Sequence, residues 1–311
     1  MILVTGSSGT IGSRLCEHLE QQSIDYMGID VKENSWNKKV NLNTIKLDLR
    51  KSINSDQLPG NIDIIVHLAA NARVFKLVQD PDLARDNFLT AYNVFEFARK
   101  QKIPKVIFSS SREAYGNSGE MTYSENEAYI RNCESNYTAS KIGGEALLHA
   151  YNQCYDMDMI ILRFSNVYGR YDFSDRVIPL FILKALKNED IIIYGKDKVI
   201  DFTYIDDTVA GIMGAIQYFD KAKNNTYNIA TGKGFPLEKV AQIITKHIGA
   251  KSKLIIKDNR RGEITHFIAD ISKAHSTLSY VPKFDLVTGL AETIKWYSSR
   301  LNAYSKQLLD Y

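Results

Sequence analysis

The chain has 311 residues, of which 44% are hydrophobic and 24% charged, a balance that indicates a folded protein with a sizeable core and excludes disorder. Its formal net charge is only +3, without a block of like charge, so neither a nucleic-acid nor a membrane surface is indicated. Three cysteines without metal-ligand spacing, and no uninterrupted apolar run of about 18 residues, are typical of a cytosolic protein without a bound metal.

The first half of the chain alternates short β-branched runs with longer amphipathic segments, and the opening MILVT runs straight into a glycine-rich turn rather than a leader segment. This alternation predicts a parallel sheet, and continuous apolar runs such as 63–67 indicate that helices cover both of its faces. Right-handed crossovers then make the sheet doubly wound. The expected strands are 2–5, 26–30, 45–49, 62–68, 106–109 and 159–163, and the expected helices are 10–22, 82–101 and 136–156.

Beyond residue 170 the pattern is looser. We expect residues 1–170 to form the sheet domain, with 201–230 returning to it, and 171–311 to form mainly a smaller α/β lobe over the carboxyl edge of the sheet. The expected elements there are strands near 191–194 and 201–205 and helices at 177–188, 206–219, 236–248 and 285–302.

The sequence GSSGTIG lies between the first expected strand and the first expected helix. The three glycines, Gly6, Gly9 and Gly12, permit a tight turn, let the backbone approach a pyrophosphate and let the helix pack closely on the strand. Amide groups at the start of the helix present partial positive charge to phosphates. The pattern therefore favours a dinucleotide site, and the alternative is a tight turn without a ligand.

Two aspartates end the next strands. Asp30 closes the second strand, where a carboxylate accepts hydrogen bonds from an adenosine ribose and repels a 2′-phosphate, which favours NAD over NADP. Lys32 nearby weakens this preference, and Asp30 is otherwise a turn residue. Asp48 is expected beside the adenine or, equally, as a cap at a strand end.

Two further motifs follow the strand at 106–109. SSSREAYG occupies 109–116, and YTASK places Tyr137 four residues before Lys141 at the start of an expected helix. Residues four apart share a helix face, so the ammonium would lower the pKa of the phenol and let it act as a base. A second YxxxK at 194–198 contains a glycine and flanks a strand, which argues against a helix. The alternative is that both residues lie on a helix surface.

In this order, the motifs resemble those of the extended short-chain dehydrogenase/reductases, specifically the NAD-dependent nucleotide-sugar epimerases and dehydratases, over essentially the whole chain. The resemblance implies a Rossmann-type domain for NAD, a carboxy-terminal lobe for a nucleotide-diphosphate sugar, and a homodimer formed through the helices near 82–101 and 137–156. The motifs are GSSGTIG, HLAA at 67–70, Asn87, SSSREAYG, YTASK, RFSNVYG at 163–169, DFTYIDD at 201–207 and RRGE at 260–263.

The resemblance also implies a 4-epimerase chemistry and its residues. Tyr137 removes the proton of the hydroxyl at carbon 4 while hydride passes to NAD, Ser111 orients the same oxygen, and Lys141 holds the nicotinamide ribose. Hydride then returns to the other face of the keto-sugar, so there is no net redox change. The further expected cofactor contacts are Thr10, Ile11, Leu49, Leu68, Ala69, Ala70, Asn87, Ser109 and Phe164.

On the substrate side, Asn166 and Arg260 are expected near the diphosphate, although Arg260 also fits a solvated basic patch with its neighbour Arg261. The family usually has an arginine immediately before the pair at 201–202, whereas this chain has isoleucine there, so Lys198 is expected to substitute as a point charge. Ile178 either lines the base pocket or belongs to an apolar helix start.

Glu113 occupies the place of a catalytic acid of the 4,6-dehydratases, but its neighbour is Arg112, a cation that cannot protonate a leaving hydroxyl. The two either form a surface ion pair, or Arg112 recognises a substrate carboxylate, which would indicate a uronic acid. A dehydratase or decarboxylase that uses Glu113 is therefore the alternative to a 4-epimerase of a UDP-hexose or UDP-uronic acid. A non-enzymatic dinucleotide sensor is a more distant alternative.

Overall fold

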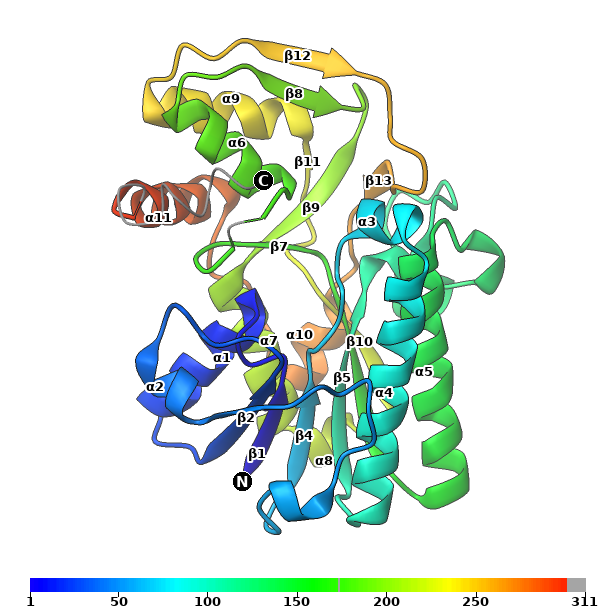
Figure 1. Cartoon of the computed structure of the whole chain (residues 1–311). Coiled ribbons are helices and arrows are strands. Elements are labelled where there is room, and N and C mark those ends of the chain that lie inside the picture. Colours follow the sequence, from blue (N-terminus) through cyan, green and yellow to red (C-terminus); the bar gives the residue numbers. More distant parts are fainter. Residues whose placement is uncertain (173, 301–311) are drawn as a thin grey trace.

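The computed structural model describes residues 1–172 and 174–300, and Figure 1 shows a larger unit below a smaller one. The larger unit is built on a seven-stranded sheet in which every neighbouring pair is parallel. Its β-branched strands are buried on both faces, as a covered parallel sheet requires. In spatial order its strands are β10 (Asn225–Ile229), β6 (Asp158–Phe164), β5 (Lys105–Ser111), β4 (Ile64–His67), β1 (Ile2–Thr5), β2 (Tyr26–Asp30) and β3 (Thr44–Lys46).

Helices cover both faces of this sheet. Alternate residues of β1 show this directly, because Val4 joins one apolar core and Leu3 the other. The prediction of a doubly wound parallel sheet is confirmed. On the Val4 side lie α1 (Thr10–Gln21), α7 (Ile205–Gln217), α8 (Phe219–Ala222) and α10 (Ser272–Leu278), and on the Leu3 side lie α4 (Asp82–Lys100) and α5 (Asn136–Tyr155).

The smaller unit is the expected α/β lobe, and it stands above the carboxyl ends of the large sheet (Figure 1). It has its own apolar core, in which aromatic and aliphatic side chains of the strands pack on three helices. Its strands are β7 (Asn166–Tyr168), β9 (Val199–Tyr204), β11 (Gly234–Pro236) and β13 (His266–Phe267) in one sheet, and β8 (Ile191–Tyr194) with β12 (Leu254–Lys257) in another. Its helices are α6 (Val177–Leu186), α9 (Leu237–Ile248) and α11 (Leu286–Ser298).

Several short elements were not expected from the sequence, because their apolar patterns extend over too few residues. They include β10, which joins the edge of the large sheet after the chain has entered the small lobe. The expected strand at 45–49 is observed at 44–46, and residues 301 and 302 of the last expected helix lie outside the described residues. Besides β7 and β10 to β13, the unexpected elements are α2 (Lys38–Leu42), α3 (Val74–Gln79), α8, α10 and the 3₁₀ turns η1 (Ser55–Gln57), η2 (Arg112–Tyr115), η3 (Glu125–Glu127) and η4 (Ile130–Asn132).

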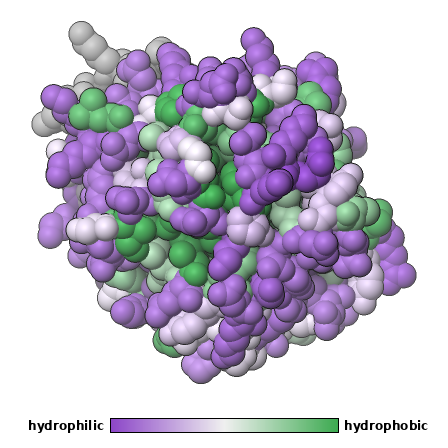
Figure 2. Space-filling view, turned by 90° about the horizontal axis from the view of Figure 1, so that it is seen from below, coloured by the Kyte–Doolittle hydropathy of each residue, from purple (hydrophilic) through white to green (hydrophobic). Residues whose placement is uncertain are grey.

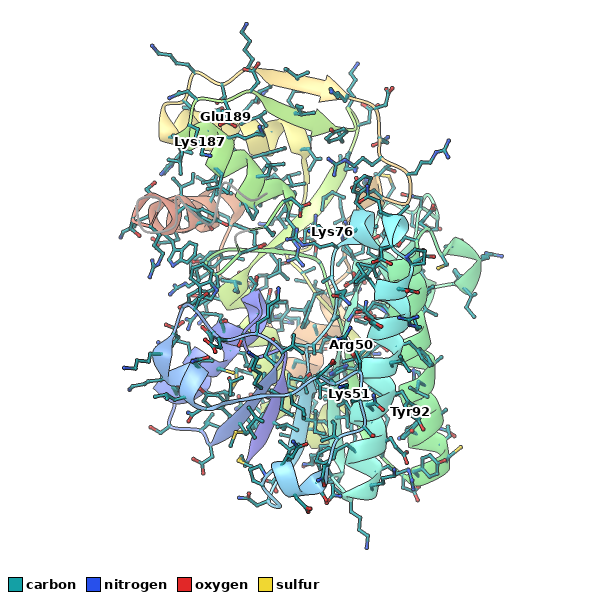
Figure 3. The ribbon with its side chains drawn as sticks, in the orientation of Figure 1. Arg50, Lys51, Lys76, Tyr92, Lys187 and Glu189 are labelled. Carbon is teal, nitrogen blue, oxygen red and sulfur yellow. The ribbon has the colours of Figure 1, made fainter. Side chains whose placement is uncertain are left out.

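The surface seen from below is mostly hydrophilic, with hydrophobic side chains gathered near its middle (Figure 2). Charged side chains such as Lys187 and Glu189 project from the small lobe (Figure 3). Within the described ranges, no helix combines the length and the apolar character that a membrane span needs.

Candidate active site

A cavity of about 530 Å³ lies between the carboxyl edge of the large sheet and the small lobe. Most of the residues singled out in the sequence come together in its wall, although they are distributed over more than 250 positions of the chain. From that set the cavity is lined by Gly6, Gly9, Thr10, Ile11, Gly12, Leu68, Ala70, Ser109, Ser111, Arg112, Glu113, Tyr137, Lys141, Phe164, Asn166, Ile178 and Arg260.

The glycine turn between β1 and α1 forms one end of the cavity. Gly6 has φ +73, a left-handed conformation that favours glycine, and a Cβ on Gly12 would lie 2.0 Å from the carbonyl oxygen of Gly6. Gly9 precedes α1 without a side-chain cap, and the first residues of the helix, Thr10 to Gly12, line the cavity. This cradle without side chains fits the pyrophosphate of a dinucleotide.

Asp30 and Ala69 adjoin this turn without lining the cavity. The carboxylate of Asp30 accepts a hydrogen bond from the amide of Ser8, at 3.0 Å, and another from the amide of Lys32, at 2.9 Å. The amide nitrogen of Ala69 would lie 2.8 Å from a Cβ on Gly6. A carboxylate placed against the glycine turn suits the ribose contact that was predicted for Asp30.

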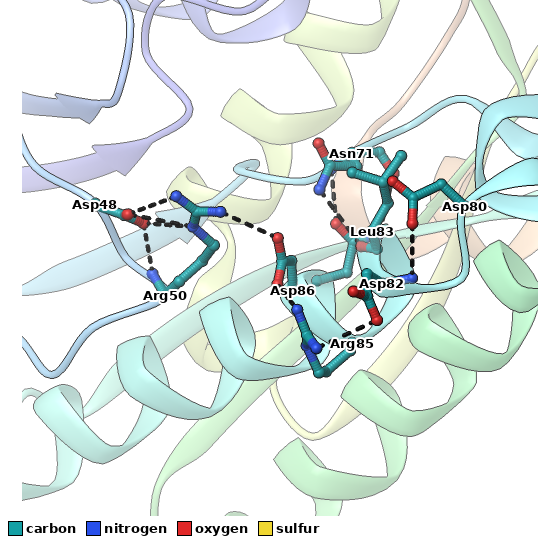
Figure 4. A network of polar contacts seen from close by, with 9 residues as sticks. Asp48, Arg50, Asn71, Asp80, Asp82, Leu83, Arg85 and Asp86 are labelled. Atoms are coloured by element: carbon teal, nitrogen blue, oxygen red, sulfur yellow. Dashed lines mark hydrogen bonds and ion pairs between the residues drawn. The ribbon is translucent and has the colours of Figure 1, made fainter.

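Asp48 and Leu49 do not line the cavity. Asp48 forms an ion pair with Arg50, at 2.7 Å, and Arg50 also contacts Asp86 of α4, at 3.2 Å (Figure 4). Hydrogen bonds from Arg50 hold the pKa of Asp48 below its usual value. Leu49 is buried in the core, and its carbonyl oxygen accepts a hydrogen bond from Asn93. The adenine contact of these two residues stays a prediction.

Asn87 is buried on α4 and does not line the cavity. Its side chain accepts from the amide of Asn71 at 2.7 Å, donates to the carbonyl oxygen of Asn71 at 3.0 Å, and donates to the hydroxyl of Ser140 at 3.2 Å. It therefore holds the loop after β4 against α4 and α5, on the side of the cavity where Leu68 and Ala70 lie.

Ser111, Tyr137 and Lys141 meet beyond the end of β5. Ser111 is the last residue of that strand, and Tyr137 and Lys141 lie in the first turns of α5, which Ser135 caps by accepting from the amide of Thr138. Lys141 donates from Nζ to the carbonyl oxygen of Ser109 at 2.7 Å, and its Nζ lies 5.9 Å from the centroid of the Tyr137 ring. All three are buried, so they are not the surface residues of the alternative interpretation.

The expected lowering of the phenol pKa by Lys141 is wrong for this structure. Burial raises the pKa of Tyr137 to about 12, although the charge of Arg176 and a hydrogen bond from Ser111 act to lower it. Burial also lowers the pKa of Lys141 to about 8. The sequence argument considered one helix only, whereas removal from water has the largest effect on the pKa of each group.

Arg112 and Glu113 form a buried ion pair in the cavity, which corrects the prediction of a surface pair. Their side chains are 10% and 5% exposed, and Nη2 of Arg112 lies 2.9 Å from Oε1 of Glu113. Nε of Arg112 donates to Oδ1 of Asn166 at 2.8 Å. Burial raises the pKa of Glu113, while Arg112 lowers it.

Of the two cationic residues that were expected to bind the substrate, only Arg260 lines the cavity. Lys198 does not line the cavity; its Nζ lies 2.6 Å from Oε2 of Glu263, which does. Arg260 lines the cavity and stacks on Tyr194 of β8, with its guanidinium carbon 3.9 Å from the ring centroid and 5.0 Å from that of Phe75 in α3. Arg260 is therefore held between two aromatic rings rather than in a free basic patch.

Sequence reasoning missed a group of charged residues that follows β7 and faces α3. Asp175 forms an ion pair with Arg73 at 2.6 Å, and Nη2 of Arg176 donates to the carbonyl oxygen of Ala72 at 3.2 Å. Lys76 of α3 also lines the cavity and lies between the two units (Figure 3). The signal available was the run of charges at 170–176 directly after a strand end.

Comparisons with known proteins agree with this geometry. Residues 2–230 match the model of the NAD dependent epimerase/dehydratase family. A Methanocaldococcus jannaschii protein, provisionally named as a UDP-glucose 4-epimerase, is 35% identical over 95% of this chain and 98% of its own. The UDP-glucose 4-epimerase of Thermotoga maritima, solved with UDP-glucose, is 27% identical with a TM-score of 0.86 over 96% of this chain and 99% of its own.

A UDP-glucuronic acid 4-epimerase of Bacillus cereus, solved with UDP-glucuronic acid and NAD, is also 27% identical, with a TM-score of 0.89 over 96% of this chain and 99% of its own. The structural relatives thus include enzymes for a neutral sugar and enzymes for a uronic acid.

Proposed function

The chain belongs to the NAD dependent epimerase/dehydratase family, and from this premise we propose that it is an NAD-dependent nucleotide-sugar 4-epimerase. The observation that carries the proposal is the convergence of the glycine turn, Ser111, Tyr137 and Lys141 on one cavity. A dinucleotide cradle and a buried phenol beside a strand-end serine are the parts that an oxidation at a sugar hydroxyl needs.

The residues present fit NAD. The amides at the start of α1 would bind its pyrophosphate, Asp30 would accept from its adenosine ribose, and Lys141 would donate to its nicotinamide ribose. When bound, NAD supplies the acceptor and later the donor of hydride, without net consumption.

The protein's own part is proton transfer and positioning. Ser111 would hold the oxygen at carbon 4, and Tyr137 would take its proton and later return it. Because burial raises the pKa of Tyr137 to about 12, the phenol needs nearby positive charge to act as a base near neutral pH. Arg176 and Arg112 already act in this direction.

The substrate is proposed to be a UDP-sugar. Solved relatives that are similar over nearly the whole chain bind UDP-glucose and UDP-glucuronic acid. Ile178, on the small-lobe side of the cavity, would contact the base, and Asn166 and Arg260 would contact the diphosphate. Lys198 would act only indirectly, through Glu263.

A second candidate is a dehydratase or decarboxylase that uses Glu113. The observation in its favour is that Glu113 is buried in the cavity and that burial raises the pKa of its carboxyl group, as expected for an acid-base group. Its ion pair with Arg112 argues for a static role instead. Glu113→Gln would abolish turnover by such an enzyme.

The test is to incubate the purified protein with UDP-, dTDP-, GDP- and CDP-sugars and to follow each by NMR. We expect one UDP-sugar to convert to its 4-epimer without added cofactor. A stable 4-keto-6-deoxy product, or release of carbon dioxide, would establish the second candidate. Tyr137→Phe should lose the sugar-dependent absorbance of reduced NAD at least about 100-fold; unchanged reduction would refute the assignment of the base.

We also propose a homodimer through α4 and α5. Phe88, Leu89 and Tyr92 of α4 are exposed by 41%, 37% and 43%. Such a row of large apolar side chains is typical of a protein interface. Leu89→Glu should halve the mass measured by light scattering, whereas Leu42→Glu, at a more exposed leucine of α2, should leave it unchanged. A monomeric unmodified protein would refute the proposal.

A cytosolic location is proposed as well. Its support is that Cys16, Cys133 and Cys154 are all free, as expected in a reducing compartment.

A further inference from the structure

Among residues 1–172 and 174–300, three buried polar atoms of the residues that line the cavity have no hydrogen-bond partner. One is Oδ2 of Asp172, which lies 3.6 Å from Nη1 of Arg176. The other two are Nη1 of Arg112 and Oε2 of Glu113, which belong to residues only 8% and 4% exposed. The other polar atoms of the two side chains have partners. Nη2 of Arg112 pairs with Oε1 of Glu113, and Nε of Arg112 donates to Asn166. Buried polar atoms without a partner are costly, and in a binding cavity a ligand can satisfy them.

The two atoms have opposite hydrogen-bonding roles. Nη1 can only donate a hydrogen bond, and an ionised Oε2 can only accept one. A ligand group that satisfies both must therefore accept from Arg112 and donate to Glu113. A hydroxyl or an amide does this; a carboxylate only accepts and would carry its negative charge against Glu113.

We propose that Arg112 and Glu113 select the sugar, binding on carbon 5 a neutral group that both donates and accepts a hydrogen bond and excluding a carboxylate there. The inference rests on the proposed function, in which Ser111 holds the oxygen at carbon 4. Arg112 and Glu113 directly follow Ser111, so they reach a carbon next to it. Of the two neighbouring carbons, only carbon 5 carries a group whose charge differs between UDP-glucose and UDP-glucuronic acid.

This assignment differs from the role of carboxylate receptor that the sequence left open for Arg112. A guanidinium free on all sides would attract a uronic acid. Here Glu113 already neutralises the charge of Arg112, so the pair offers a carboxylate no net positive charge. A site that is built to hydrogen-bond a substrate hydroxyl discriminates strongly against an analogue that leaves its polar groups unpaired.

The experiment measures dissociation constants by titration calorimetry on the NAD-loaded protein at pH 8, for UDP-glucose, UDP-xylose, UDP-glucuronate and UDP alone. UDP-xylose has no group on carbon 5. We expect affinities in the order glucose, xylose, glucuronate, with UDP-glucose bound at least about 30-fold more tightly than UDP-glucuronate. This order in the unmodified protein does not depend on any variant folding.

Glu113→Gln keeps the shape and removes the charge, and it should reduce the ratio of glucose to glucuronate affinity to less than about 3-fold. Glu263→Gln is the matched control, because it removes a negative charge from the same cavity without touching the pair. UDP alone should bind each variant as it binds the unmodified protein, which shows that the variant is folded.

Tighter binding of UDP-glucuronate than of UDP-xylose would overturn the inference while leaving the epimerase proposal intact. An unchanged ratio in Glu113→Gln, or an equal change in Glu263→Gln, would overturn it as well. Failure of every UDP-sugar to bind would refute the proposed function itself, and the inference with it.

Discussion

The buried ion pair between Glu145 of α5 and Arg163 of β6 is predicted to stabilise the framework of the site. Oε1 and Oε2 of Glu145 accept from Nε and Nη2 of Arg163 at 3.0 and 2.7 Å, and both side chains are less than 10% exposed. The hydroxyl of Ser110 also donates to Glu145. Since Ser110 lies between the acceptor of Lys141 and Ser111, the pair joins three elements directly behind the proposed catalytic residues.

Glu145→Gln is the perturbation. The amide accepts at one atom only and turns an N–H group toward the guanidinium, which leaves the charge of Arg163 buried without compensation. Loss of one partner of a buried pair costs about 3–5 kcal/mol, equal to about 10² to 10⁴ in the folding equilibrium constant. That is a large part of the about 5–15 kcal/mol by which folded domains are stable.

The assay is urea unfolding followed by circular dichroism, with Asp82→Asn as the control. Asp82 pairs with Arg85 three residues later on α4, at 3.2 Å, and the two side chains are 69% and 61% exposed. An exposed pair of this kind contributes about 0.3–0.5 kcal/mol, so its loss should hardly change the midpoint. If Glu145→Gln cost less than 1 kcal/mol, or no more than Asp82→Asn, the reasoning about the buried pair would be refuted.

Three further predictions follow from the site. Burial lowers the pKa of Lys141 from 10.5 to about 8. Between these two pH values the unfolded chain therefore binds more protons than the folded protein, and the free energy of unfolding rises with pH. Urea unfolding between pH 8 and 10 should show about 2 kcal/mol more gain for the unmodified protein than for Lys141→Met, and equal gains would contradict this. Gly12→Ala places a Cβ 2.0 Å from the carbonyl oxygen of Gly6, so the NAD dissociation constant measured by calorimetry should rise at least about tenfold, while Gly60→Ala, where nothing lies within 4 Å, should leave it unchanged. Asn87→Ala removes three buried hydrogen bonds and should lower the free energy of unfolding by about 1–3 kcal/mol in urea titrations; a change below 0.5 kcal/mol would show that the loop is held by other contacts.

The parts of the fold and site that the sequence predicted are those with local signals. The glycine turn was recognisable because strand, glycines and helix follow one another within 12 residues. Tyr137 and Lys141 were recognisable because a spacing of four places both on one helix face. The doubly wound sheet followed from apolar runs long enough to show their period.

The electrostatics could not be predicted in this way, because they depend on residues far apart in the chain. The pKa of Tyr137 is set by burial under the small lobe and by Arg176, 39 positions away. Lys198 is neutralised by Glu263, from a loop 65 residues later. Arg112 and Glu113 are adjacent, but their burial depends on distant segments such as β7, whose Asn166 contacts Arg112.

The position of β10 has a consequence for synthesis on the ribosome. Residues 225–229 pair with β6 at the outer edge of the large sheet, although about 60 residues of chain separate the two strands. A nascent chain that ends near residue 170 would leave the backbone groups along β6 unpaired, an edge prone to association with other chains. The dinucleotide domain therefore completes its folding only after much of the small lobe has emerged, and a fragment cut at residue 170 is expected to aggregate rather than to bind NAD.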